Sequence, residues 1–474
     1  MRGVLSFLKS AGIYFAGNVL TRMISFFLLP LYTAFIVPAD MGYYDTSLSY
    51  LNILMPVVCM EIWTAIMRFM YRSEEEDGKY RVVYQGLLLF SVSALVYSGL
   101  FVLLRFVRPE LPCFWLIYAY GMLTMLQNIY SFVTRGFGKN RLFALSGLCG
   151  SLCASLANIV MIVFLGLRLQ SLYWAAILGL VLQIGMMESR VGLLRHWRGV
   201  RLERSLLREM TRFALPLALN SACFWFLSGY NKVGLTNELG AAANGLYAVA
   251  ARFTTAVSLI STCFSLAWQE LAYSVGDREG DKSRFYSTAS DYYLRFLIAG
   301  LLLLVPLVRV IFPWMVADSY AEAENLVPLY LFATVASVYS TFLGSIFAAE
   351  NKTNIVFTST LCAAVVNVSL FHLLVGSFGI QAANIALLTG FAVNILVRLW
   401  VLRSSVPVRI RWQLPVVLLV GFGVDFVCYC RCSRAVNALL LGATLLLCVA
   451  AFLPMLRELL QILRCRRSQK GSRN

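Results

Sequence analysis

The chain has 474 residues, 60% of them hydrophobic, and its mean hydropathy is +0.75. Soluble domains are nearer half apolar, so this composition excludes a soluble globular protein and indicates a protein that crosses a membrane many times. The net charge of +17 would suggest a nucleic-acid partner in a soluble chain. In a membrane protein it marks cytoplasmic loops instead, and no nucleic acid is expected.

Fourteen apolar runs are long enough, at about 20 residues, to cross a bilayer as helices. The even number places both chain ends on one side. The first run is too long for a signal peptide and contains Arg22, so we expect it to stay as the first span. The expected spans of this all-α integral membrane protein are 11–36, 45–70, 82–104, 112–133, 142–166, 171–188, 212–235, 244–271, 291–313, 325–349, 354–376, 379–402, 412–430 and 436–455.

The Lys and Arg residues support this topology, because alternate connections carry nearly all of them. With both termini in the cytoplasm, the outer connections hold only Arg105, Arg108, Arg168, Arg431 and Arg434. The longest and most basic connection, Glu188 to Thr211, divides six spans from eight. It fits an amphipathic helix lying on the inner headgroups, and it fits a solvated linker equally well.

Two weak internal repeats indicate two related halves. We expect a six-helix bundle at 1–188, a basic cytoplasmic linker at 189–211, a second six-helix bundle at 212–402, and two extra helices with a basic tail at 403–474. Five prolines within the expected spans predict kinks, at Pro30, Pro56, Pro216, Pro306 and Pro328. The matched repeat positions are Gly42 with Gly245, Tyr44 with Tyr247, Lys139 with Lys352 and Asn158 with Asn367.

Charged residues inside the first two spans need an explanation, since a guanidinium at bilayer depth costs at least about 2.5–3.5 kcal/mol. Arg22 and Glu61 are expected at similar depth. They form either a structural pair or part of a water-filled cavity that attracts anions. Arg68 lies two helical turns after Glu61, on the same face and near enough to the interface to snorkel.

Other polar residues have plainer interpretations. Asp291 and Arg295 are spaced for an i, i+4 pair, Arg398 is expected to snorkel, and His372 is either packed in an apolar helix or a proton relay. The twelve cysteines predict no disulfide framework. The one cluster, at Cys428, Cys430 and Cys432, lacks nearby histidines, so no metal site is expected.

Residues spread over the first twelve expected spans resemble a known family, the polysaccharide (O-antigen type) flippases of the multidrug/oligosaccharidyl-lipid/polysaccharide exporter superfamily. The residues that carry the resemblance are Asn18 and Arg22, Gly42 and Tyr44, Gly138 and Lys139, Leu215 and Pro216, Asn231 and Lys232, Gly245 to Tyr247 with Arg252, Asn351 to Thr353, and the FGI-x-A-A pattern at Phe378 to Ala383.

The resemblance implies a V-shaped, alternating-access transporter in the bacterial inner membrane. Its substrate would be an undecaprenyl-pyrophosphate-linked oligosaccharide, a precursor of O-antigen, lipopolysaccharide or capsule, and its coupling ion H⁺ or Na⁺, with no cofactor. Relatives often have Asp where this chain has Asn231, which weakens that position as a proton carrier. Membrane lipids and other polysaccharide-assembly membrane proteins are the expected partners of a monomer.

An anionic substrate needs fixed cations along its path, and Arg offers the best donor geometry. Arg22 and Arg252 are one candidate in each half, and Lys232 joins them. A structural ion pair for Arg252 and a snorkelling Lys232 are the plainer alternatives. The predicted substrate-binding residues are Arg22, Arg252, Lys232, Asn18, Glu61 and Arg68.

The sugar hydroxyls call for amides, which an intramembrane helix uses as often to bind its neighbours. Candidates are Asn18, Asn158, Gln183, Asn220, Asn367, Asn384 and Asn394. Three other functions stay open. The sequence does not distinguish a flippase for lipid II from one for a lipid-linked oligosaccharide. A small-molecule exporter would need acidic cavity residues, of which only Glu61 fits, and a membrane-bound glycan polymerase or ligase would need catalytic residues in the outer connections. We expect no enzyme.

Overall fold

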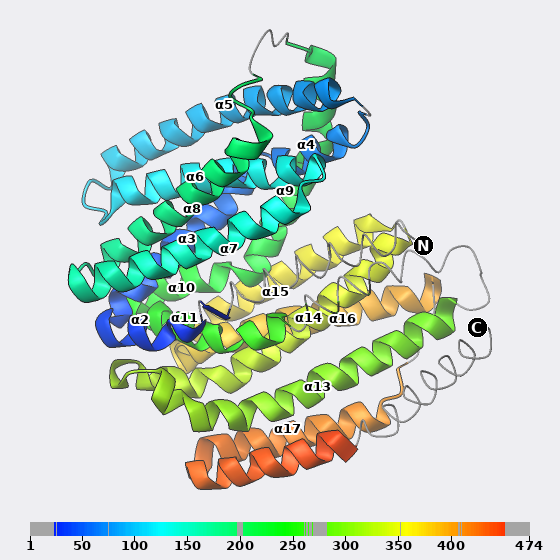
Figure 1. Ribbon diagram of the computed structural model, residues 1–474. Helices are drawn as coiled ribbons and strands as arrows, with labels where there is room; N and C mark the ends of the chain where they lie inside the picture. The colour runs from blue at the N-terminus through cyan, green and yellow to red at the C-terminus, as the bar shows by residue number, and fades with distance from the viewer. Residues whose placement is uncertain are drawn as a thin grey trace, which may run out of the picture.

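The computed structural model describes residues 23–450 except 25, 74, 197–201, 260, 262–263, 265–267, 269–281, 351, 406–407 and 409. In that part of the chain every regular element is a helix (Figure 1). The first half contains α2 (Leu29–Phe35), α3 (Pro38–Val58), α4 (Ile62–Met70), α5 (Glu76–Val107), α6 (Phe114–Gly136), α7 (Asn140–Ile159) with the π-helical turn η1 (Val160–Phe164), and α8 (Leu169–Val191).

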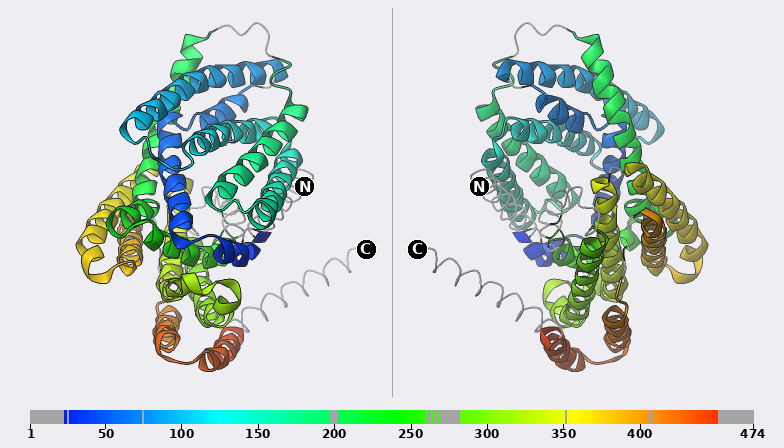
Figure 2. Two further views of the ribbon diagram at one scale, coloured as in Figure 1. Left: turned by 90° about the vertical axis from the view of Figure 1, so that its left-hand side faces the viewer. Right: turned by 90° about the vertical axis from the view of Figure 1, so that its right-hand side faces the viewer.

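The second half repeats this all-helical pattern and adds two further helices. It contains α9 (Arg204–Ser228), α10 (Tyr230–Leu239), α11 (Ala241–Phe253), α13 (Lys282–Met315), the 3₁₀ segment η2 (Asp318–Leu326), α14 (Val327–Ala349), α15 (Thr353–Phe378), α16 (Gln381–Ser405) and α17 (Gln413–Arg431). A last apolar helix, Arg434–Ala450, follows α17. This terminal pair lies at the edge of the molecule farthest from the first half (Figure 2), where α17 packs against α13.

Within the described residues, seven helices are long and apolar enough to cross a membrane, and nine if each of two bent pairs counts as one span. The protein is therefore a multi-span membrane protein. The boundaries agree with the expected spans to within a few residues over most of the chain, while the total of fourteen stays a prediction. The largest differences are at α13, which begins at Lys282 instead of the expected 291, and at α9, which begins at Arg204 instead of the expected 212.

Two expected single spans are broken. The span from Pro38 to Met70 bends by 50° where Met60 and Glu61 adopt left-handed backbone conformations, and the span from Arg204 to Leu239 bends by 46° at Gly229. Three of the five prolines lie inside helices as expected, namely Pro56, Pro216 and Pro306. Pro30 and Pro328 instead occupy the first turn of α2 and α14, where the missing N–H breaks no hydrogen bond and no kink is required.

One predicted repeat is visible in the backbone. The N–H of Lys139 donates to the carbonyl of Thr134 at 3.0 Å, and the N–H of Lys352 donates to that of Phe347 at 2.8 Å. Each bond spans five residues and closes the turn before α7 and α15, respectively. The two turns are therefore built alike, which supports the matching of Lys139 with Lys352.

The halves meet most closely where α3 crosses α11, at the left of Figure 1. A Cβ on Gly42 would overlap the carbonyl oxygen of Ala241, and a Cβ on Gly245 would overlap that of Pro38. Each glycine thus faces a backbone carbonyl of the opposite helix, four residues before the other glycine. The predicted match of Gly42 with Gly245 is a reciprocal contact in space, possible only because glycine has no side chain.

We expect Gly42→Ala or Gly245→Ala to destabilise the folded protein by about 1–3 kcal/mol, since the added methyl group forces the two helices apart. Thermal unfolding followed by tryptophan fluorescence measures this change. Gly99→Ala in α5 is the matched control, because its Cβ would have no atom within 4 Å. Equal unfolding temperatures for Gly42→Ala and Gly99→Ala would contradict the close crossing.

Candidate functional site

Polar contacts join the two halves around the point where α3 and α11 cross at Gly42 and Gly245, which we call the glycine crossing. The Lys232 ammonium of α10 lies 3.0 Å from the carboxylate of Asp45 on α3. The side-chain amide of Asn244 donates to the carbonyl of Gly42 at 3.0 Å and to the Thr46 hydroxyl at 2.9 Å. These bonds pair buried donors with acceptors and so hold α3 against α10 and α11. The side-chain carbonyl oxygen of Asn244 is buried without a partner among the described residues.

Further along α3 the same interface continues to α9. The indole N–H of Trp225 donates to the carbonyl of Ser49 at 2.8 Å, and the Ser49 hydroxyl donates to the carbonyl of Gly229 at 3.0 Å. The inter-half contact therefore extends to the break between α9 and α10.

Arg252, the predicted cation of the second half, lines a small cavity of about 170 Å³ against helices of the first half. The guanidinium forms no ion pair with any carboxylate in the part of the chain that the structure describes. The other polar residues of the cavity are Tyr32, Tyr44, Ser151, Ser155 and Asn158. The cavity thus combines one cation with hydroxyl and amide groups from α2, α3 and α7.

Asn158 contributes an unused acceptor to this cavity. Its side-chain N–H donates to the hydroxyl of Tyr32 at 3.1 Å, whereas its carbonyl oxygen is buried without a partner among the described residues. A buried acceptor of this kind is costly unless a ligand or water supplies a donor. Asn18 and Arg22, which were also predicted to bind substrate, lie outside the described residues.

Glu61 is at the break between α3 and α4. One carboxylate oxygen accepts from the hydroxyl of Ser221 on α9 at 2.7 Å, and the other accepts from that of Thr64 at 3.3 Å. Its predicted pairing with Arg22 involves a residue that the structure does not describe. Glu61 therefore connects the first half to α9 by accepting a hydrogen bond from the hydroxyl of Ser221.

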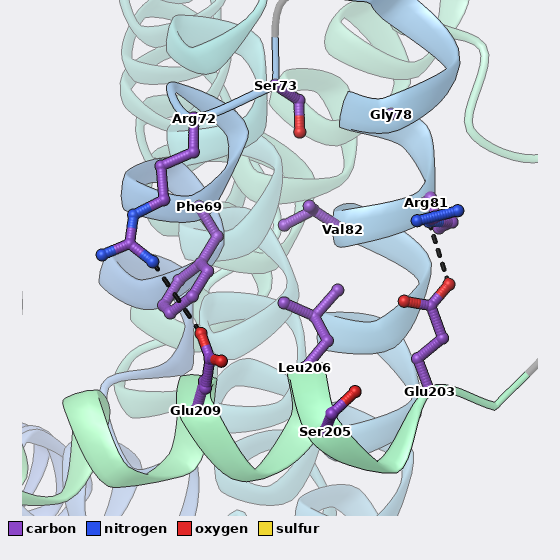
Figure 3. Close-up of a pocket in the computed structure, with 10 residues that line it drawn as sticks. All are labelled: Phe69, Arg72, Ser73, Gly78, Arg81, Val82, Glu203, Ser205, Leu206 and Glu209. Atoms are coloured by element: carbon purple, nitrogen blue, oxygen red, sulfur yellow. Dashed lines mark ion pairs between the residues drawn. The ribbon is translucent and has the colours of Figure 1, made fainter.

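Arg68 is exposed, and its guanidinium stacks on the ring of Phe213 at 4.0 Å from the ring centroid. Near it, α4, α5 and the start of α9 enclose a cavity of about 310 Å³ (Figure 3). Its two cations are both paired, Arg72 with Glu209 at 3.8 Å and Arg81 with Glu203 at 2.9 Å. The charges that line this cavity therefore balance, whereas the Arg252 cavity is lined by one cation and no carboxylate.

Asn231 and Asn367 bond to each other rather than facing a cavity. Each side-chain amide donates to the carbonyl oxygen of the other, at 3.1 and 3.0 Å, and Asn231 also donates to the backbone carbonyl of Ala383 at 2.8 Å. Neutral amides carry no titratable proton. This cluster is a structural link among α10, α15 and α16.

The structure confirms the Asp291–Arg295 pair, at 2.8 Å. The expectation that Arg398 snorkels was wrong, because its side chain points inward and only 4% of the residue is exposed. His372 is not simply packed: its side chain is 45% exposed, and its ring lies 2.7 Å from the Tyr230 hydroxyl and 3.4 Å from the Glu238 carboxylate. Among the described residues no cluster of His, Cys, Asp and Glu is placed to hold a metal ion.

Sequence reasoning missed Asp45 and Asn244. Both were readable in principle, since Asp45 follows Gly42 by one helical turn and Asn244 directly precedes Gly245. What was lacking was the knowledge that the two glycine motifs face each other.

Solved structures with a similar fold are membrane transporters. The lipid II flippase MurJ in its inward closed conformation aligns with a TM-score of 0.70 at 12% identity, covering 94% of this chain and 99% of that chain. A multidrug resistance MATE family transporter of the MOP superfamily aligns in its inward-facing conformation with a TM-score of 0.63 at 16% identity, covering 83% and 94%. At these identities the likeness establishes the fold alone.

An outward-facing multidrug resistance MATE family transporter aligns less well, with a TM-score of 0.51 at 14% identity, covering 84% of this chain and 95% of that chain. No curated protein matches the chain significantly. Residues 7–268, more than half of the chain, match the family described as "Polysaccharide biosynthesis protein". The chain has the fold of the MOP superfamily and belongs to the polysaccharide biosynthesis protein family.

Proposed function

We propose that the protein is a transporter, not an enzyme, that moves an undecaprenyl-pyrophosphate-linked oligosaccharide from the inner to the outer leaflet of the bacterial inner membrane. The observation that carries this proposal is the Arg252 cavity, where a cation unpaired among the described residues lies beside the unused acceptor of Asn158. Arginine suits a phosphate, and an amide oxygen suits a sugar hydroxyl.

Family membership supports the same substrate class, because a polysaccharide built on a lipid carrier has to cross the membrane. A lipid II type flippase shares this anion chemistry. A small-molecule exporter is disfavoured, since the Arg252 cavity contains no carboxylate. The substrate is identified by removing the protein from cells and determining which lipid-linked sugar accumulates on the cytoplasmic leaflet.

The glycine crossing suggests how the path is closed on one side. In this conformation Lys232 is held by Asp45, so it becomes available to an anionic substrate only when α3 and α10 separate. We propose that transport alternates between this closed contact and its opening, as expected for two halves with a path between them. Lys232 then binds substrate late in the cycle, and Arg252 and Arg22 bind it earlier.

Arg252→Gln is expected to lower export at least tenfold, because a hydrogen bond to a charged group contributes about 1.5–3 kcal/mol. Arg252→Lys should retain part of the activity. Export of the polysaccharide by cells that contain only the variant, at equal membrane levels, measures the effect. The matched control is Arg141→Gln, an exposed arginine on α7, and full export by Arg252→Gln would overturn the assignment.

Reversing one partner of the ion pair, as in Asp45→Lys, is expected to weaken the closed contact, since two like charges then face each other at a partly buried site. The double variant Asp45→Lys with Lys232→Asp should restore most of the lost stability and part of the export. Thermal unfolding and export are both measured. A double variant no more stable than either single one would show that the pair does not stabilise the closed state.

Glu61→Gln is expected to alter the rate of export more than stability, because a glutamine still accepts the hydrogen bond from Ser221 while losing the charge. Glu61→Leu, which loses both, should also lower the unfolding temperature. Absence of the Glu61→Gln protein from the membrane would instead assign Glu61 a structural role.

A further inference from the structure

A third cavity, of about 870 Å³, lies wholly within the second half, among α9, α14, α15 and α16. It is separate from the Arg252 cavity and shares no residue with it. Its walls are mostly apolar, and two of the apolar residues are exposed, Leu219 to 56% and Phe224 to 44%. The open side of the cavity is therefore apolar on α9, while Thr341, Asn354 and Thr358 are its exposed polar residues on α14 and α15.

Arg398 lies at the buried side of this cavity and has only neutral partners. Its Nε donates to the Ser359 hydroxyl at 3.0 Å, its Nη1 to the carbonyl and hydroxyl of Ser340, and its Nη2 to the Thr360 hydroxyl at 3.2 Å. No carboxylate in the described part of the chain pairs with it. A guanidinium within a membrane span is costly, and it pairs with a counter-charge, a backbone carbonyl or water. The carbonyl of Ser340 and the three hydroxyls accept hydrogen bonds from Arg398 but do not neutralise its charge.

Three features leave room for a ligand at this cation. A guanidinium has five N–H groups, and one N–H of Nη2 has no partner among the described residues. The carbonyl oxygen of Asn394, which also lines the cavity, is buried without a partner there, so it can accept a hydrogen bond from a hydroxyl of the ligand but not from its phosphate. Gly344 keeps the space open, because a Cβ on it would lie 2.8 Å from Nη1 of Arg398.

We propose that the Arg398 cavity binds an anionic amphiphile, with the phosphate group at Arg398 and the hydrocarbon chain leaving past Phe224 and Leu219. A single guanidinium surrounded by neutral hydroxyls matches one negative charge, as on the phosphodiester of a membrane phospholipid. The apolar walls exclude free phosphate as the best fit, since a hydrated ion would gain nothing from them.

The inference stands apart from the proposed function, because binding is measured without transport. Full-length protein in a neutral maltoside detergent is mixed with phosphatidylglycerol or with phosphatidylcholine, and retained lipid is counted by native mass spectrometry. The wild-type protein should retain one phosphatidylglycerol at least tenfold better than phosphatidylcholine. Retention of both lipids to the same extent would overturn the proposal.

Arg398→Gln should reduce phosphatidylglycerol retention at least tenfold, and Arg398→Lys should reduce it less. Arg403→Gln is the matched control, since Arg403 is an exposed arginine on the same helix. Arg252→Gln should also leave retention unchanged, which separates this site from the proposed transport site. Retention by folded Arg398→Gln equal to that of the wild-type protein would overturn the proposal.

Gly344→Ala tests the site without changing any charge. If Arg398→Gln does not fold, this variant shows whether the Arg398 cavity binds the lipid. Its methyl group displaces the guanidinium, so retention should fall, whereas Gly376→Ala has open space around its Cβ and should bind normally. If Gly344→Ala retained as much phosphatidylglycerol as the wild-type protein, the proposed binding site at Arg398 would be contradicted.

A competition experiment with undecaprenyl phosphate identifies the source of the amphiphile. Displacement of phosphatidylglycerol would show that the carrier lipid shares the site. Persistence of phosphatidylglycerol would show a resident phospholipid. Either result supports an anionic amphiphile site at Arg398.

Discussion

The arrangement of the two halves depends on the crossing of α3 and α11 at Gly42 and Gly245. With a side chain at either position the backbones could not approach this closely, because each Cβ would occupy the space of the opposite carbonyl oxygen. The crossing brings Asp45 within reach of Lys232 and places Asn244 against the backbone of α3. The polar contacts between the halves are therefore consequences of the glycines rather than independent attractions.

The polar residues of the interior fall into two groups, those whose hydrogen bonds link helices and those that line cavities. The side-chain amides of Asn231 and Asn367 donate to each other and to neighbouring backbone carbonyls, so they stabilise helix packing. Few of their N–H groups remain to bind a ligand. Arg252 and Arg398 instead line cavities and have no carboxylate partner within the described residues. Since an intramembrane charge without a counter-charge is costly, these two positions are where a bound anion contributes most.

The sequence predicted the all-helical membrane fold and most helix boundaries, because apolar length alone defines a span. It also identified the Gly-x-Tyr repeat. Arg252, which the sequence singled out as a substrate-binding cation, lines a cavity, and its role stays a prediction. The sequence did not predict the break at Met60 and Glu61, since neither residue is a glycine, the residue that usually marks a left-handed conformation. Arg398 was misread because its distance from a helix end suggested snorkelling, while its hydroxyl partners come from α14 and α15, far away in sequence.

Helix α9 belongs to both halves, and this limits how they can move. Its N-cap residue Glu203 pairs with Arg81 of the first half, and Met210 and Ala214 are buried in the core of that half. Leu227 near its other end is buried in the core of the second half. A rigid α9 would prevent the halves from separating. Pro216 removes one backbone hydrogen bond in the middle of the helix, and Gly229 marks its break. If the contact between α3 and α11 opens as we propose, bending at these two residues would let one end of α9 stay with each half.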